Sequence, residues 1–252
     1  MNSCTKLARL CWNLLKIGVK NPRRWSHVLG TALAASEEVV HADADLLGLR
    51  QVKPEDLLPT GNERWRISLE LLARTNASVS TLEFLCLVML LRQARARSVF
   101  EFGTYKGVSI TQLALNVPAD ARICTLDLPE GQTDSALPIS IQKDISIAFE
   151  SGKGALVPPD LRERIQFLHQ DSALFDPAPY DGQMDFVFVD GAHNTEYVRN
   201  DSEKGWRMLR PGGIIVWHDF ALGDLDVVRY LLTAPYRAAR VVGTSLAYAV
   251  KF

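Results

Sequence analysis

The sequence predicts an α/β fold in which helices cover both faces of a mostly parallel sheet. Short β-rich runs alternate with helical patterns between residues 98 and 218, which is typical of βαβ units. Several of these runs are apolar almost throughout, as strands that are buried on both faces must be. Together these patterns indicate a Rossmann-like, doubly wound, mostly parallel seven-stranded sheet. The 252 residues are enough for one large domain with an N-terminal helical extension.

The first 79 residues predict this extension. Leu7, Leu10, Leu14 and Ile17 recur at helical spacing. A Pro-containing stretch over 52–60 interrupts the helical pattern, which resumes over 64–73. No strand-like run is found here, so we expect a helical cap over residues 1–79 that lies outside the sheet.

Residues 1–36 carry six basic side chains and no acidic one. Two hypotheses explain this bias. The helix packs on the domain or in a homodimer, or it docks on an anionic membrane surface. Its short apolar face favours packing over membrane contact.

Residues 80–252 predict the Rossmann-like domain. Ser80 and Glu83 have the spacing of a capping box, and an apolar helix follows. One or two closing strands, antiparallel in one hypothesis, are expected over 239–250, and 129–160 is an insertion with a short helix near 145–149. The expected strands before them are Ser98–Phe102, Ile123–Leu128, Ile165–His169, Phe186–Asp190 and Ile214–His218.

Composition limits the classes of partner and compartment. The net charge of −1 gives no indication of a polyanionic partner, so we expect a small-molecule substrate and no nucleic acid. The four cysteines are widely spread without metal-site spacing, which favours reduced thiols in a cytoplasmic protein. No run of 18 apolar residues is present, so we expect no membrane span.

The first predicted strand of the domain ends in a glycine loop, Glu101-Phe102-Gly103-Thr104-Tyr105-Lys106-Gly107. Gly103 and Gly107 allow a sharp turn and a close approach of backbone to a ligand. The tighter G-x-G-x-x-G of dinucleotide sites is absent, and the carboxylate of Glu101 would repel a pyrophosphate. Glu101 suits a cofactor with ammonium and sulfonium groups. The alternative is a plain strand-to-helix turn.

Polar residues also end the next two strands. Asp127 could accept hydrogen bonds from both ribose hydroxyls, as carboxylates do at the second strand of nucleotide-binding folds. Asp171 and Ser172 could bond an adenine amino group. Each of these residues could instead cap the following segment. The conjunction of the three strand ends favours a site for an adenosine-containing ligand.

A second constellation follows the last two parallel strands. Asp190 and His193 follow one strand, and His218 and Asp219 end the other. Carboxyl ends of neighbouring parallel strands meet at one crevice, so these side chains should converge. We expect catalytic roles for His193, Asp190 and His218, with His193 as the base because its ordinary pKa lies near 6.5. Asp190, His218 and Asp219 could hold Mg²⁺ or a similar ion. A structural role is the alternative for each histidine alone.

The segments VFEFGTYKGVSITQLA and DFVFVDGAHNTEYVRNDSEKGWRMLRPGGIIVWHDF resemble class I S-adenosylmethionine-dependent methyltransferases of the methyltransferase domain 24 type, related to catechol O-methyltransferase. The resemblance covers about residues 78–252. It implies that the glycine loop and Ser109 surround the methionine part of the cofactor, that Asp127 takes the ribose and that Asp171 and Ser172 take the adenine edge. It also places Asp190 beside the methionine amine and, in metal-using relatives, on Mg²⁺. The cofactor set is Glu101, Gly103, Thr104, Tyr105, Gly107, Ser109, Asp127, Leu128, Asp171, Ser172 and Asp190.

The chain departs from catechol-type enzymes at two places. They have an Asp-Asn pair where this chain has His218 and Asp219, and a lysine base where His193 stands. The resemblance implies O-methylation of a small hydroxylated molecule or a sugar, with a divalent metal as a further hypothesis. The alternatives are an NAD-dependent oxidoreductase and a non-catalytic protein that binds a nucleoside cofactor.

Overall fold

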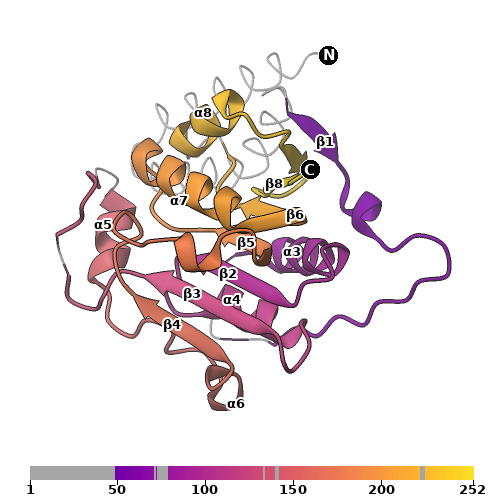
Figure 1. Cartoon of the computed structure of the whole chain (residues 1–252), viewed down its shortest axis with the longest axis horizontal. Helices are drawn as coiled ribbons and strands as arrows, with labels where there is room; N and C mark the ends of the chain where they lie inside the picture. Colours follow the sequence, from indigo (N-terminus) through magenta and orange to yellow (C-terminus); the bar gives the residue numbers. More distant parts are fainter. Residues whose placement is uncertain (1–48, 71, 73–78, 133, 140–141, 222–224) are drawn as a thin grey trace, which may run out of the picture.

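The computed structural model describes residues 49–70, 72, 79–132, 134–139, 142–221 and 225–252. The helices expected within residues 1–48 lie outside this part of the chain. One eight-stranded sheet runs through the molecule in the order β1-β7-β8-β6-β5-β2-β3-β4 (Figure 1). The strands are β1 Arg50–Val52, β2 Ser98–Phe102, β3 Arg122–Asp127, β4 Ile165–His169, β5 Met184–Val189, β6 Leu209–Trp217, β7 Ala239–Val241 and β8 Ala247–Val250.

The sheet is mostly parallel, as the sequence predicts. Among these strands, β8 alone runs antiparallel to its neighbours, which are β6 on one side and β7 on the other. The other pairs are parallel. The helices between the strands are α3 Thr81–Gln93, α4 Val108–Leu115, α5 Gln142–Phe149, α6 Pro159–Arg162, α7 Thr195–Met208 and α8 Leu225–Thr233, with 3₁₀ turns η2 Pro54–Leu57 and η3 Ala178–Tyr180. No helix in these ranges is long and apolar enough to cross a membrane.

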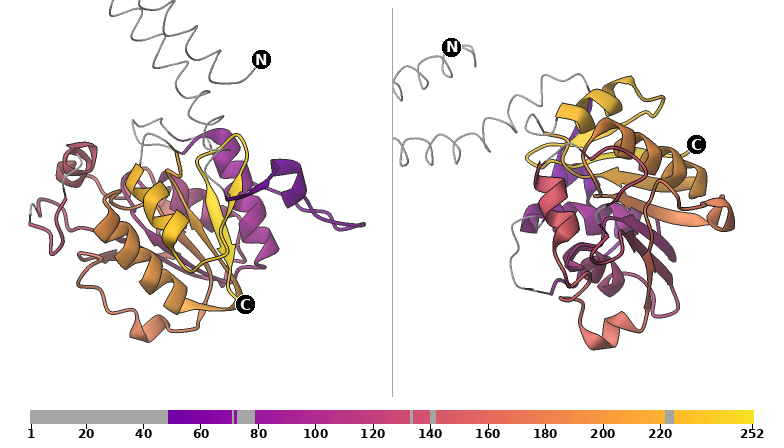
Figure 2. Two further views of the ribbon diagram at one scale, coloured as in Figure 1. Left: turned by 90° about the horizontal axis from the view of Figure 1, so that it is seen from above. Right: turned by 90° about the vertical axis from the view of Figure 1, so that its left-hand side faces the viewer.

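Helices cover both faces of the sheet (Figure 2). Successive side chains of a strand point to opposite faces, so the apolar run of β5 supplies both cores. Phe186 and Phe188 pack in a cluster with α3 and α4. Val187 and Val189 pack in a second cluster with α7 and α8. This two-sided burial is the reason why these strands are apolar throughout.

The N-terminal cap of α3 matches the sequence pattern. Ser80 Oγ accepts a hydrogen bond from Glu83 N (3.3 Å), and Glu83 Oε2 accepts one from Ser80 N (2.8 Å). This reciprocal pair satisfies two backbone donors that the first helical turn leaves free. The predicted capping box is confirmed.

Two expectations for the extension are wrong. Arg50–Val52 forms β1 and pairs parallel with β7, so the sheet has eight strands and the extension supplies one of them. Residues 64–70 form no helix. Their backbone is instead held by side chains of α4: Asn116 exchanges two hydrogen bonds with Ser68 N and O (3.0 and 2.7 Å). Gln112 does the same with Glu70 N and O (3.0 and 2.8 Å).

The strand order reverses between β2 and β5. β2 pairs with β3 on one side and with β5 on the other, while the chain passes through β4 before it reaches β5. Open α/β sheets bind ligands at such a switch point, outside the carboxyl ends of the strands. The glycine loop follows β2, and Asp190 follows β5, so both lie at this point.

Candidate functional site

A cavity opens at the carboxyl ends of β2 to β6. Twelve of the fourteen residues that the sequence singles out line it, whereas Glu101 and Gly107 do not. The strand ends thus converge as expected. The twelve are Gly103, Thr104, Tyr105, Ser109, Asp127, Leu128, Asp171, Ser172, Asp190, His193, His218 and Asp219.

The glycines of the loop make close backbone packing possible. Gly103 has φ +96, and a Cβ there would lie 2.0 Å from the carbonyl oxygen of Asp190. Gly107 has φ +86, and a Cβ there would lie 2.3 Å from a methyl carbon of Val157. These glycines are needed because neighbouring chain segments approach them. The loop itself, through Thr104 and Tyr105, faces the cavity.

Glu101 lies behind the cavity wall. Its carboxyl group is fully buried and accepts hydrogen bonds from Ser109 Oγ and Thr125 Oγ1, each 2.6 Å long. Burial raises the pKa of Glu101 to about 8, although both hydroxyl groups act in the opposite direction. The carboxyl group of Glu101 does not line the cavity, whereas Ser109, which donates to it, does. A direct role of Glu101 in cofactor binding stays a prediction.

Asp127 lies at the cavity end of β3. Its Oδ2 accepts a hydrogen bond from Tyr105 N (2.6 Å), which ties β3 to the glycine loop. Its Oδ1 lies 3.2 Å from Nζ of Lys153, a residue of the insertion. The contact between Lys153 and Asp127 is not predicted by the sequence, because no motif or spacing links the insertion to the end of β3.

Asp171 is occupied by the chain's own donors. Its two oxygens accept hydrogen bonds from Ala136 N (2.7 Å), Ala173 N (2.8 Å) and Tyr197 Oη (3.0 Å). The backbone bond to Ala173 is the capping arrangement that was the alternative for this residue. Ser172 and the buried Asp201 of α7 also line the cavity here. Binding of adenine by Asp171 stays a prediction.

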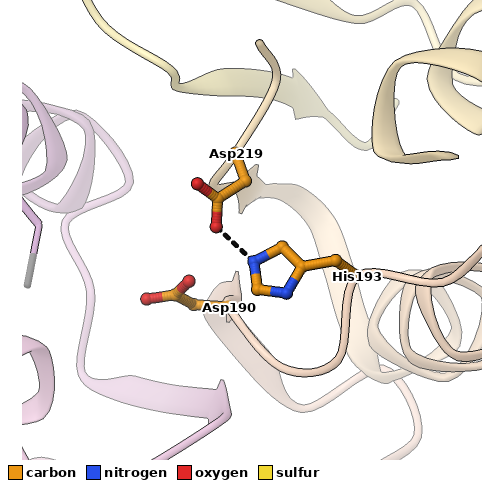
Figure 3. A group of neighbouring side chains, drawn as sticks. All are labelled: Asp190, His193 and Asp219. Carbon is orange, nitrogen blue, oxygen red and sulfur yellow. Dashed lines mark hydrogen bonds and ion pairs between the residues drawn. The ribbon is translucent and has the colours of Figure 1, made fainter. Parts of the chain in front are cut away.

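His193 is held between the carboxylates of Asp144 and Asp219, and Figure 3 shows its contact with Asp219. Asp144 of α5 accepts from His193 N (2.7 Å) and contacts Nδ1 (2.6 Å), and Asp219 contacts Nε2. Burial lowers the pKa of His193, but the two carboxylates outweigh it and raise the pKa to about 10. The imidazole is therefore protonated at neutral pH. The expectation that His193 acts as a base with an ordinary pKa does not hold in this arrangement.

His218 contacts Asp219 as well, and its other acidic neighbours are Asp190 and Glu83. Its Nδ1 is 3.2 Å from Asp190 Oδ1 and 3.1 Å from Asp219 Oδ2, and its Nε2 is 3.6 Å from Glu83 Oε2. Burial lowers the pKa of His218, but Asp219 and Asp190 raise it well above its usual range. Burial raises the pKa of Glu83, yet His218 and Ser245 hold it well below its usual range. Glu83 thus caps α3 and also balances the charge of His218.

Asp219 has a left-handed backbone, with φ +56. Such a conformation is rare for a residue with a side chain, and it is found most often where function constrains the backbone. Burial raises the pKa of Asp219, but His218 and His193 hold it well below its usual range. The turn directs this carboxylate between the two imidazoles.

One group in the described part of the chain has the geometry of a metal site. Asp190, His193 and Asp219 each offer one ligand atom, and these atoms lie within 4.8 Å of one another (Figure 3). Two carboxylates with one imidazole suit a divalent ion that accepts oxygen and nitrogen. The sequence predicts the same two carboxylates with His218, whose Nδ1 contacts both of them.

Residues 100–220 match the family model described as a methyltransferase domain. These residues are therefore similar to methyltransferase domains. A caffeoyl-CoA O-methyltransferase from Petroselinum crispum is 33% identical over 127 residues, which are 50% of this chain and 47% of the relative. Caffeoyl-CoA O-methyltransferase 2 from Populus trichocarpa is 27% identical over 143 residues, or 55% and 53% of the two chains.

The chain thus spans about half the length of these curated relatives. The solved structure of cofactor-bound Rv0187 from MTB aligns with 87% of this chain and 89% of that chain, at 19% identity and a TM-score of 0.50. That likeness shows a shared fold. The predicted Rossmann-like methyltransferase architecture is confirmed by the family match and the sheet order.

Proposed function

We propose that this chain transfers a methyl group from S-adenosylmethionine to a hydroxyl oxygen of a small molecule or sugar. One observation carries the proposal: a single cavity contains both the strand ends suited to an adenosine cofactor and the cluster of Asp190, His193 and Asp219. The match to a methyltransferase domain and the similarity to O-methyltransferases support it.

The cofactor would lie along the carboxyl ends of β2 to β5. Asp127 is placed to accept a hydrogen bond from the ribose, and Ser172 to contact the adenine end. Asp190 supplies a carboxylate for the methionine ammonium group, which opposite charge favours. The loop from Gly103 to Tyr105 forms the wall beside the methionine part.

The reaction is a displacement at a carbon that the positive sulfur already activates. A bond forms between the acceptor oxygen and the methyl carbon, and the carbon–sulfur bond breaks with its electron pair going to sulfur. The acceptor hydroxyl group gives up its proton. Orientation of the two reactants in one cavity can contribute up to about 7–11 kcal/mol in well-aligned cases.

We assign the proton to a carboxylate and not to His193, since the imidazole already carries its own proton. Asp144 and Asp219 pair with that imidazole, and Asp190 pairs with His218, so we assign the proton to this group of carboxylates and not to one member of it. His193 and His218 provide positive charge beside the developing charge on the acceptor oxygen. Preorganised charge of this kind is a major source of catalysis.

A divalent metal would fit the donor set of Asp190, His193 and Asp219 provided that its binding releases the proton from the ring nitrogen of His193 that faces the group. Asp144 holds Nδ1 of His193, so the other ring nitrogen is directed at the group, as metal-binding histidines are oriented by a second carboxylate. When bound, the ion would polarise a hydroxyl group and lower its pKa. Mg²⁺ prefers oxygen ligands, so the imidazole favours a transition metal.

Calorimetry with S-adenosylhomocysteine tests the cofactor assignment, with NAD as the comparison. We expect binding of the former and none of the latter; no uptake of S-adenosylhomocysteine at millimolar concentration would overturn the proposal. Transfer of labelled methyl groups to a panel of catechols and sugars tests the reaction. His193→Ala should lower turnover and leave cofactor binding intact.

A further inference from the structure

Lys153, in the insertion, places a buried ammonium group inside the cavity. Its side chain is 2% exposed, and Nζ lies 3.2 Å from Asp127 Oδ1 and 3.3 Å from the carbonyl oxygen of Ile147. Lys153 and Asp127 both line the cavity. A buried charge is costly unless it is paired and hydrogen-bonded. The pairing therefore puts a strong donor and a strong acceptor side by side on the cavity wall.

The backbone that carries Lys153 is fixed to its surroundings. Glu130 Oε1 accepts hydrogen bonds from Gly152 N (2.6 Å) and Lys153 N (2.9 Å). Gly154 N donates to Tyr105 O (2.7 Å) in the glycine loop. The backbone at the lysine is thus held to Glu130 within the insertion and, at the next residue, to the glycine loop, so the ammonium group is held in place before any ligand binds.

Lys153 and Asp127 can each form a further hydrogen bond with a ligand. An ammonium group has three donors. One is directed to Asp127 Oδ1 and one to the carbonyl of Ile147, so the third is available to a ligand acceptor in the cavity. Asp127 Oδ2 already accepts from Tyr105 N, and a carboxylate oxygen can accept a further bond.

We propose that Lys153 and Asp127 together bind the vicinal hydroxyl pair of a ribose, which makes Lys153 a specificity-determining residue of the cofactor site. The inference rests on the proposed function. Each ribose hydroxyl group can donate and accept, so one can donate to the carboxylate while its neighbour accepts from the ammonium group. The lysine–aspartate pair is neutral in sum, which suits an uncharged sugar.

The proposal predicts strong discrimination against sugars that lack one hydroxyl group. A site built to hydrogen-bond a hydroxyl group rejects the analogue without it, because a buried polar group is then left unpaired. Aspartate alone can only accept from a ribose. The lysine adds a requirement for an oxygen at the neighbouring position.

Calorimetric titration of the full chain with S-adenosylhomocysteine and with its 2′-deoxy and 3′-deoxy analogues tests this. The wild type should bind the parent compound at least about 10-fold more tightly than either analogue. Lys153→Met keeps the length of the side chain and removes its charge. It should weaken binding of the parent about 10-fold and leave one of the two deoxy analogues bound as in the wild type. Lys153→Arg should restore part of the affinity.

Glu130→Ala tests the position of the lysine. It leaves the ammonium group and removes the acceptor of Gly152 N and Lys153 N, so it should reproduce the effects of Lys153→Met only in part. The inference is overturned if Lys153→Met weakens all three ligands equally, or if the wild type binds all three alike. If Lys153→Met unfolds, Lys153→Arg decides: the displaced charge should change the affinity for the parent relative to one deoxy analogue, and an unchanged ratio overturns the inference. A wild type that binds none of the three overturns the proposed function itself.

Discussion

Replacing Asp144 by asparagine should lower the pKa of His193 by about 2 units. Burial lowers this pKa, but Asp144 and Asp219 raise it from 6.5 to about 10. The difference, 10 − 6.5, is about 3.5 units, or ~5 kcal/mol in favour of the imidazolium at about 1.36 kcal/mol per unit. Both carboxylates make a hydrogen bond and a charge interaction with the ring. Because burial opposes this rise, the two carboxylates together contribute more than 3.5 units, so loss of one charge should remove at least half of the net rise and bring the pKa to about 8 or below.

The same shift has a consequence for stability. A histidine whose pKa is raised by folding stabilises the fold fully below its unfolded pKa of 6.5, and this contribution is lost as the pH rises through about 10. The wild type should therefore lose free energy of unfolding between pH 6.5 and 10. In Asp144→Asn this contribution is smaller and is lost by about pH 8 to 9. Urea unfolding at pH 6, 8 and 10 measures both curves.

Histidine ring resonances measured by NMR between pH 5 and 10.5 report the pKa directly. The chain has five histidines, and His193→Gln identifies the resonance that belongs to His193. A chelator keeps metal ions away from the ring nitrogens. A wild-type His193 that titrates near pH 6.5 would refute the double-carboxylate clamp and restore His193 as a candidate base. An unchanged pKa in Asp144→Asn would show that Asp219 alone sets it.

Three further substitutions test other parts of the site. Asp127→Ala should weaken binding of S-adenosylhomocysteine about 10- to 100-fold, the loss of a hydrogen bond to a charged group; calorimetry that shows wild-type affinity would exclude the ribose role. Burial opposes ionisation of Glu101 in the folded state, so the wild type should lose free energy of unfolding as the pH rises from 4.5 to about 8. Glu101→Gln should abolish this loss, because the amide does not ionise. A pH-independent difference between the two proteins in urea unfolding would contradict this. Gly103→Ala should destabilise the fold by about 3 kcal/mol or more, because the added Cβ would lie 2.0 Å from the carbonyl oxygen of Asp190. Gly61→Ala is the control: Gly61 has φ +65 and no atom within 4 Å of the added Cβ, so the change should cost about 1 kcal/mol. Equal losses of stability in thermal unfolding would rule out the clash at Gly103.

The sequence predicts the central strands well because their signal is local. β2 has the predicted bounds and is buried over four of its five residues, as expected for a strand covered on both faces. β4 also has the predicted bounds, although it is an edge strand with Gln166 and His169 exposed. The polar strand ends converge for the same reason: parallel strands all present their carboxyl ends at one edge. Asp127 and Asp190 could therefore be assigned to one cavity from the sequence.

The prediction for residues 49–70 is wrong for the opposite reason, because the structure there depends on contacts with residues that are distant in the sequence. β1 has three residues, and only its pairing with β7 makes it a strand. Residues 64–70 have a helical pattern of side chains, yet the backbone of Ser68 and Glu70 bonds to Asn116, which caps α4, and to Gln112 of α4. The N–H groups of Ser68 and Glu70 are therefore not available for helical hydrogen bonds.

The insertion explains why the chemistry of the site was harder to predict than its place. Asp144 comes from the insertion and reverses the expected protonation of His193. Lys153 comes from the same segment and adds a cation beside Asp127. The contact of Asp144 lies where we propose that the methyl acceptor binds, and the contact of Lys153 lies where we propose that the ribose binds. Both contacts would be lost if the insertion moved away from the sheet. Because one segment carries both side chains, a cofactor that contacts Lys153 should restrict this segment further and strengthen the contact of Asp144 with His193. Bound S-adenosylhomocysteine, which needs Lys153 in place, should hold Asp144 against the ring and shift the NMR titration of His193 upward.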